Sequence, residues 1–187
     1  MLKEFNLVAA TYRKRENDCI SELWFFAKEI GDRRLEASKT GLPSLIVART
    51  SIDPEEFAAN AREAILKNPW TFRYLLKLVP IHTVVNAELG EIAEAAVRLA
   101  GEKMRPEDTY KVEARIRLST LQRDEVIDAI ASRLSNKVNL GEPDKVIVVE
   151  IIGERAGLSV IPPSLIVSVE KLRRIARRRA SQERRGL

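Results

Sequence analysis

The order of helical and strand-like patterns in residues 1–80 restricts the fold more than any other feature of the sequence. β-Branched and aromatic residues mark strands, apolar residues at three- and four-residue spacing mark helices, and Asp53 followed by Pro54 marks a helix start. The expected elements are a strand at 5–12, a helix at 15–31, strands at 35–38 and 45–50, a helix at 54–67 and a strand at 72–79.

This succession is the strand-helix-strand-strand-helix-strand order of a ferredoxin-like sandwich, in which two helices cover one sheet. An RNA-recognition motif shares that order, but its third strand carries aromatic residues for base stacking, and SLIVARTS here has none. Base stacking on this sheet is therefore not expected. The neighbouring Trp24, Phe25 and Phe26 are interpreted as a core and interface block, and the buried stripe of the first helix is expected to be Ile20, Leu23, Trp24, Ala27 and Ile30.

Pro80 marks the expected start of a second domain, because a proline ends the hydrogen-bond ladder of a strand. The pattern then changes to a helix at 86–104, a strand at 109–117, a helix around 126–134, strands at 145–152 and 157–161, and a last helix after Pro163. The strand-helix-strand unit at 109–152 is expected to be parallel and right-handed. The overall prediction is an α/β (α+β) chain with domains at 1–80 and 81–168 and a basic C-terminal helix and tail at 169–187.

The positive charge of the chain is concentrated at its C-terminal end. Residues 171–187 contain eight Lys or Arg and one acidic residue, whereas residues 1–170 hold 24 of the 32 basic and 26 of the 27 acidic residues, a formal charge of −2. The apolar repeat Leu172, Ile175 and Ala176 predicts that the helix continues into this segment and ends before Ser181, with the remainder frayed.

Groups typical of catalysis or metal binding are scarce in the sequence. The sequence has one Cys and one His, Cys19 and His82, which are too few for the ligand motif of a zinc or haem site. It also has no phosphate-binding glycine loop and no nucleophile elbow. Cys19 is interpreted as a small core residue and His82 as a loop imidazole. The sequence therefore predicts neither catalysis nor a cofactor. No apolar run approaches the roughly 18 residues that a membrane span needs, and a cytoplasmic chain is expected.

Residues 135–161 carry the most informative pattern. A helix end leads into a polar loop, a buried strand, a tight turn and a partner strand. The segment resembles the C-terminal half of the THUMP domain, and the matching positions are Lys137, Val138, Leu140, Pro143, Asp144, Val149, Glu150, Ile151, Gly157, Leu158 and Ser159. Asn139 departs from the pattern, which has Asp there, so a salt bridge in this loop is not expected.

The resemblance implies a function. Residues 1–80 fit the ferredoxin-like domain that commonly precedes THUMP, and the chain resembles the stand-alone THUMP protein that assists a separate tRNA acetyltransferase in forming acetylcytidine. It implies a tRNA-binding adaptor without catalysis of its own, which grips the acceptor stem and the 3′ end. Two alternatives remain: a general or ribosome-associated RNA-binding protein, and an enzyme with an unrecognised site.

Three groups of residues are candidates for RNA contact. On the strand at 109–117, Lys111, Arg115 and Arg117 project opposite the apolar set and suit phosphate contacts, with a solvated face paired to Glu113 as the alternative. Lys137 and Asn139 lie in the loop where a terminal nucleotide can meet exposed backbone. The third group lies on the last helix and is expected either to attract RNA phosphates or to dock an acidic protein. It consists of Arg173, Arg174, Arg177 and Arg178.

Overall fold

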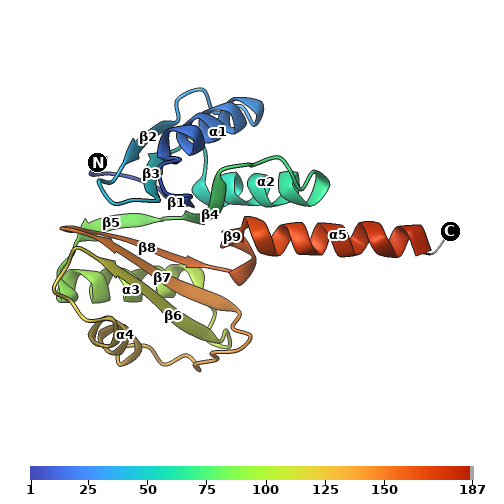
Figure 1. Cartoon of the computed structure of the whole chain (residues 1–187). Helices are drawn as coiled ribbons and strands as arrows, with labels where there is room; N and C mark the ends of the chain where they lie inside the picture. Colours follow the sequence, from blue (N-terminus) through green and yellow to red (C-terminus); the bar gives the residue numbers. More distant parts are fainter. Residues whose placement is uncertain (186–187) are drawn as a thin grey trace. The chain divides into compact units, whose positions relative to one another are not determined.

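The computed structural model describes residues 1–185 of the chain, which form two compact units (Figure 1). The N-terminal unit consists of residues 1–2, 7–80 and the segment from Leu165 onward, and the second unit consists of residues 3–6 and 81–164. The last helix is thus grouped by its contacts with the N-terminal unit.

The N-terminal unit contains one antiparallel sheet with the strand order β2-β3-β1-β4-β9. Its first four strands have the order of a ferredoxin-like sandwich, as the sequence predicts. The elements are β1 (Leu7–Thr11), α1 (Glu16–Glu29), β2 (Glu36–Lys39), β3 (Leu45–Arg49), α2 (Pro54–Lys67), β4 (Leu75–Pro80), β9 (Val167–Ser168) and α5 (Val169–Arg185). Helix α2 begins where expected, because the Asp53 carboxylate accepts hydrogen bonds from the backbone N–H groups of Glu55 and Glu56.

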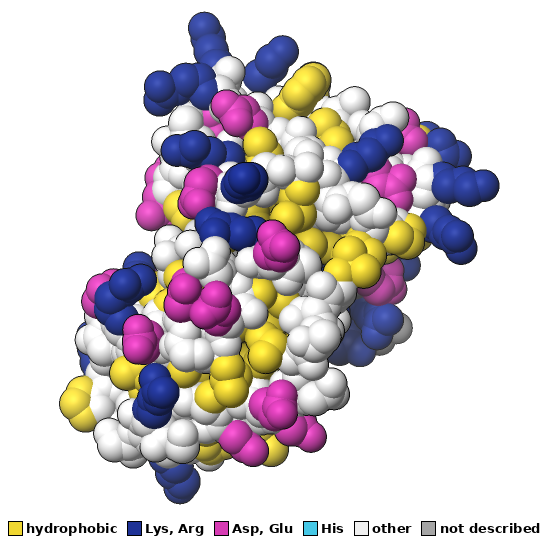
Figure 2. All heavy atoms as spheres, turned by 90° about the vertical axis from the view of Figure 1, so that its left-hand side faces the viewer, with side chains coloured by type: hydrophobic (Ala, Val, Ile, Leu, Met, Phe, Trp, Pro, Cys, Tyr) yellow, Lys and Arg dark blue, Asp and Glu magenta, His cyan; other side chains and the backbone are white. Residues whose placement is uncertain are grey.

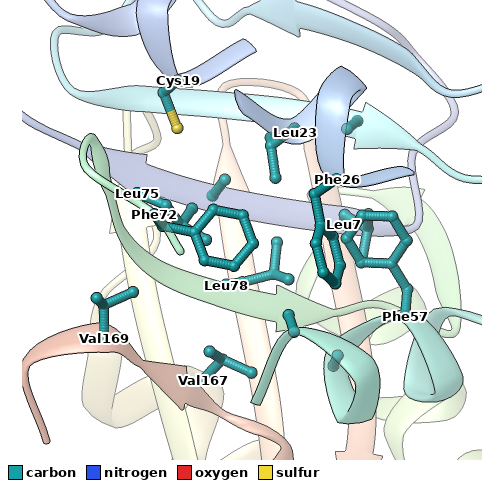
Figure 3. Close-up of a cluster of buried hydrophobic side chains, with 14 of the residues drawn as sticks. Leu7, Cys19, Leu23, Phe26, Phe57, Phe72, Leu75, Leu78, Val167 and Val169 are labelled. Carbon is teal, nitrogen blue, oxygen red and sulfur yellow. The ribbon is translucent and has the colours of Figure 1, made fainter. Parts of the chain in front are cut away.

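The core of this unit lies between the sheet and its helices (Figure 3). Phe26 of α1 makes edge-to-face contacts with Phe57 and Phe72, at centroid distances of 5.5 and 5.0 Å. Val169 and Leu172 of α5 belong to the same cluster. The last helix therefore contributes apolar burial to this unit in addition to its charges.

The buried stripe of α1 differs from the expected one. Phe26 is in the core, but Trp24 is 49% exposed, so the prediction that it belongs to the buried stripe was wrong. Phe25 is 68% exposed, and an interface role for this part of the aromatic block stays a prediction. The side chains that α1 buries are Cys19, Leu23, Phe26 and Ala27. These positions share one helical face, and Trp24 is rotated from Leu23 by about 100°, the turn per residue of a helix with 3.6 residues per turn.

Helix α5 extends further than expected. It runs to Arg185, so the prediction that it ends before Ser181 was wrong, while the predicted fraying of Gly186 and Leu187 lies outside the described residues. The segment beyond Ala180 contains no proline or glycine before position 186, and the Ser181 hydroxyl donates to the Arg177 carbonyl at 2.9 Å. Arg, Gln and Glu are good helix formers, so the helix continues without an apolar stripe.

The second unit contains a sheet with the strand order β5-β8-β7-β6, in which β6 and β7 are parallel and the other pairs are antiparallel. The elements are β5 (Thr83–Asn86), α3 (Leu89–Lys103), β6 (Tyr110–Arg117), α4 (Arg123–Ala131), β7 (Lys145–Ile152) and β8 (Arg155–Ile161). Helices α3 and α4 cover one face of this sheet (Figure 1) and share its apolar cluster. The parallel pairing of β6 with β7 confirms the predicted parallel arrangement of these strands.

Two short strands were not predicted, β5 and β9. Strand β5 has four residues and pairs with β8, about 70 residues later in the chain, and β9 has two residues and pairs with β4. Strands this short carry too little alternation for a period to be read. Their pairing partners are distant in sequence, so only the tertiary structure identifies them.

Glycine is needed at position 157 of β8 because the side chains of Phe5 and Ile81 lie against its backbone. A Cβ atom at this position would lie 2.8 Å from a ring carbon of Phe5 and 3.1 Å from a methyl carbon of Ile81. All three residues belong to the second unit. Any larger residue here would overlap the Phe5 ring, which gives a packing reason for the glycine of the predicted Gly-Leu-Ser pattern.

Candidate nucleic-acid interface

The three cations predicted on β6 lie on the sheet face opposite α3 and α4, but they have different surroundings. Tyr110 and Ala114 are buried in the cluster that includes both helices, which places the alternate residues on the other face. Lys111 forms an ion pair with Glu113 at 2.8 Å, as the alternative interpretation expected for this residue. Arg115 is exposed, with half of its side chain accessible to solvent.

Arg117 has a partner that the sequence did not indicate. Its Nη1 donates to Oε2 of Glu150 at 2.6 Å, and the Glu150 residue is only 2% exposed. Arg115 approaches the other carboxylate oxygen at 3.8 Å. Because β6 and β7 are parallel and in register, Arg115 lies directly beside Glu150. A buried carboxylate requires compensation, so Arg117 is first of all a structural partner of Glu150.

The loop after α4 lies beside the start of β6. The Tyr110 N–H donates to the Lys137 carbonyl at 3.0 Å, and the Asn139 N–H donates to the Tyr110 carbonyl at 2.8 Å. These two backbone bonds bring Lys137 next to the cationic strand, although the two were predicted separately. The Lys137 side chain is exposed, and so are Val138 and Leu140.

The side chain of Asn139 shapes this loop. Its Oδ1 accepts the N–H groups of Gly141 and Glu142, each at 3.1 Å, and its Nδ2 donates to the Glu142 carbonyl at 2.8 Å. An aspartate could accept the first two bonds but could not donate the third. Asn139 thus uses both atoms of its side-chain amide to close a turn. What this loop offers to RNA is therefore the exposed residues next to Asn139.

The end of the same loop is held by Asp144. Its Oδ2 accepts both the N–H and the hydroxyl of Thr109, each at 2.8 Å. These hydrogen bonds hold the pKa of Asp144 below its usual value, because they stabilise the charged carboxylate. The loop is therefore fastened to β6 at two places, which presents Lys137 and Leu140 in a defined position.

A groove of about 620 Å³ lies along β6, and its lining includes Lys111, Arg115 and Leu140 together with Arg123. Sequence reasoning missed Arg123, the first residue of α4, because only the fold brings it to the strand. The lining also includes Glu113, the ion-pair partner of Lys111, so the groove combines three basic side chains with one carboxylate and an exposed leucine. Basic side chains in this arrangement suit the phosphates of a nucleic acid.

The four arginines predicted on α5 divide into two kinds. Arg173 donates to the carbonyls of Pro69 and Phe72 at 2.8 and 2.6 Å, so it fastens the helix to the loop before β4. Arg174 pairs with Glu170 on the surface at 3.1 Å, and Arg177 and Arg178 are exposed. On the face of the molecule in Figure 2, Lys and Arg are interspersed with Asp and Glu, in keeping with the near-neutral charge of residues 1–170.

Cys19 and His82, the two residues considered as catalytic candidates, have surroundings typical of structural residues. Cys19 is fully buried, and burial raises the pKa of its thiol to about 12, so the thiolate needed by a nucleophile is not populated near neutrality. The Nδ1 atom of His82 accepts the Val160 N–H at 3.3 Å. Within residues 1–185 there is no cluster of three or more His, Cys, Asp or Glu placed to hold a metal ion. None of the helices described is both long and apolar enough to cross a bilayer.

Comparison with known proteins identifies the domain that contains this groove. Residues 86–161 match the family model of the THUMP domain. The chain thus contains a THUMP domain, and domains of this kind are RNA-binding modules. No curated protein matches the sequence.

Solved structures share the fold at low sequence identity. PH1313 from Pyrococcus horikoshii Ot3 has 17% identity and a TM-score of 0.56, and the match covers 85% of this chain and 55% of that one. TrmN from Thermus thermophilus has 19% identity and a TM-score of 0.59, with 84% and 45% covered. A 4-thiouridine synthetase solved with RNA and ATP has 13% identity and a TM-score of 0.52, with 84% and 41% covered. The chain thus spans about half the length of these proteins.

Proposed function

We propose that this protein is a tRNA-binding adaptor that grips the acceptor stem and the 3′ end and presents the tRNA to a separate acetyltransferase for acetylcytidine formation. The observation that carries the proposal is the THUMP match at residues 86–161, because THUMP domains imply RNA binding in tRNA modification and the residues of the β6 groove fall within this range. Localisation in the cytoplasm, where tRNA is modified, belongs to the same proposal.

The groove and its loop support contact with a terminal nucleotide. Arg115 of β6 and Arg123 of α4 offer cations to phosphates, whereas Lys111 is already paired with Glu113. Lys137 lies beside β6, because its neighbour Val138 forms a backbone bridge with Tyr110. A loop fastened at both ends loses little conformational freedom on binding, so its exposed side chains can read a shape rather than charge alone.

The surroundings of Cys19 and His82, the two side chains that could be reactive, support a binding role rather than a catalytic one. Cys19 has a thiol with a pKa of about 12, and the His82 ring accepts a backbone N–H. The Cys19 thiol is thus not presented as a nucleophile, and His82 uses its Nδ1 atom in a structural hydrogen bond. Chemistry on the bound tRNA would then be done by the partner enzyme.

The proposal is tested by measuring affinity for intact tRNA and for the same tRNA without its single-stranded 3′ end. We expect the truncated tRNA to bind more weakly, and Lys137→Ala to remove most of that difference. Equal binding of both tRNAs would favour a general or ribosome-associated RNA-binding protein. Sequencing the RNA bound from total tRNA identifies the species, and stimulation of acetylcytidine formation by the added protein tests the partner.

An equal loss of affinity for the intact and the truncated tRNA in Lys137→Ala would show that this lysine acts only through its charge on the RNA backbone. Binding of acetyl-CoA by the isolated protein would contradict the adaptor role and favour an enzyme with an unrecognised site.

A further inference from the structure

The N-terminal unit carries an exposed tryptophan that lies outside the THUMP residues. Trp70, in the loop between α2 and β4, is 68% exposed. An indole is a large apolar group, and leaving it open to water forgoes the stabilisation that its burial would bring. A single exposed aromatic residue is ordinary, so its neighbours decide whether Trp70 is more than that.

The loop that carries Trp70 is held on both sides. The Trp70 N–H donates to Oδ1 of Asn68 at 3.1 Å, and the Thr71 hydroxyl donates to the Asn68 carbonyl at 2.8 Å. Arg173 donates to the carbonyls of Pro69 and Phe72, one on each side of Trp70. The exposed ring is thus mounted on a fixed backbone, and a ligand that stacks on it does not have to order the loop first.

Two arginines of α5 accompany the ring. The guanidinium carbons of Arg173 and Arg177 lie 5.0 and 5.8 Å from the ring centroid. These residues are one helical turn apart and approach the indole from the same helix. Their positive charge strengthens the attraction of the site for an anion while most of the tryptophan stays open to solvent.

Next to Arg177 the surface of α5 is hollowed. A depression of about 290 Å³ is lined by Arg177, Arg178, Ser181 and Gln182. The four side chains offer guanidinium, hydroxyl and amide groups, all of which bind phosphate oxygens. An aromatic ring therefore adjoins a hollow lined by hydrogen-bond donors along one helix, with Arg177 common to both.

We propose that Trp70 and the neighbouring face of α5 bind a segment of single-stranded RNA, with an unpaired base stacked on the indole and its phosphates on Arg177 and Arg178. Aromatic stacking beside cations is the usual composition of single-strand sites, since every base offers a π-face. In a duplex the bases are already stacked on one another and do not offer that face. An acidic peptide would satisfy the arginines but has no flat ring for Trp70. The inference rests on the proposed RNA binding and adds a second site to it.

Intrinsic fluorescence tests the stacking directly. The chain has two tryptophans, so Trp24→Phe leaves Trp70 as the single tryptophan, whose emission is excited selectively over that of the three tyrosines. An oligoadenylate of about 12 nucleotides, enough to cover one single-strand site, should quench this emission, because a stacked base contacts the indole. A duplex of the same length should leave it nearly unchanged. Quenching by polyglutamate but not by oligoadenylate would overturn the proposal in favour of an acidic protein partner.

Affinity measurements on the full chain give the second test. Trp70→Ala should weaken oligoadenylate binding about tenfold, the loss of one stacked base, and Trp70→Phe should restore part of it. Phe25→Ala is the matched control, because Phe25 is also 68% exposed in the same unit and has no arginine over its ring among the described residues. It should leave the affinity unchanged. Thermal unfolding of both variants should match the wild type, since both rings are mostly in water.

The outcomes separate this inference from the proposed function. If Trp70→Ala binds oligoadenylate as the wild type does, or loses duplex and single-strand binding equally, the Trp70 site is wrong while tRNA binding through the groove can stand. If the wild-type protein binds no RNA of any kind, the proposed function itself fails.

Discussion

The arginines of β6 and the arginines of α5 are the same residue type in two regions, and the structure uses them differently. On β6, Arg117 is bonded to the buried carboxylate of Glu150, and Arg115 lies beside the same group. On α5, Arg177 and Arg178 project into solvent, and Arg173 is bonded to two backbone carbonyls. A guanidinium is available to a nucleic acid only where no group of the protein already requires it. Counting cations along a sequence therefore overestimates a binding surface.

The largest expected effect is that of Arg117→Ala. It leaves Glu150 buried with only the more distant Arg115, so the free energy of unfolding should fall by about 3 kcal/mol, the scale of breaking a buried ion pair. Urea unfolding measures it. Adding Glu150→Gln should recover part of the loss, because the uncompensated charge is removed. A fully stable single variant would show that Glu150 is not a buried partner and would return Arg117 to the RNA surface.

Arg173→Ala should have the next largest effect. It removes two charge-assisted hydrogen bonds to Pro69 and Phe72, and a decrease in the free energy of unfolding of about 2 kcal/mol is expected. Arg174→Ala is the control one residue away, because its exposed pair with Glu170 contributes less than about 1 kcal/mol. If the two variants lose the same amount, the arginines of α5 do not divide into the two kinds described.

Arg115→Ala should separate binding from stability. With half of the side chain exposed and 3.8 Å to Glu150, its removal should lower the unfolding free energy by less than about 1 kcal/mol. Affinity for tRNA should fall by about 1 kcal/mol or more, since hydrogen bonds to charged groups contribute on that scale. Filter binding at fixed salt measures the affinity. Unchanged affinity in the folded variant would place the RNA away from the β6 groove.

The smallest effect on stability is expected for replacing Arg174, Arg178 and Arg179 with Gln. All three are exposed, so the free energy of unfolding should change by less than about 1 kcal/mol. If they attract phosphates, the slope of log affinity against log salt should flatten by about 2 to 3 units, three contacts at 0.7 to 0.9 each. Preference for tRNA over an unrelated duplex should survive. An unchanged slope with lost stimulation of the acetyltransferase would favour docking of a protein partner on α5.

These substitutions are a sharper test than removing the C-terminal segment. Leu172 and Ala176 of α5 are buried, and Leu172 belongs to the core cluster of the N-terminal unit. Deleting residues 171–187 would therefore remove packing together with charge. Glutamine is polar and has nearly the helix propensity of arginine, so it removes the charge without removing the helix or its buried side chains.

Several features of the site were predictable from local sequence. The alternation in residues 110–117 placed Lys111, Arg115 and Arg117 on one face, and the resemblance of residues 135–161 led to the THUMP domain. What could not be predicted were the partners of those residues. Glu150 and Arg117 are 33 positions apart, Arg123 enters the groove from another helix, and Trp70 meets α5 across about 100 positions.

The sequence by itself determined the order of the main elements, the ferredoxin-like arrangement, the parallel unit of β6 and β7 and the charged face of β6, because each depends on periodicity within a few residues or on how consecutive elements connect. The tertiary structure alone decided which arginines are bound to the protein and which face water. It also decided that Trp24 is exposed, that β5 and β9 exist and that the loop at 137–139 lies against β6. The physical reason is that burial and pairing depend on groups brought together from distant parts of the chain, and a local pattern contains no information on which groups those are.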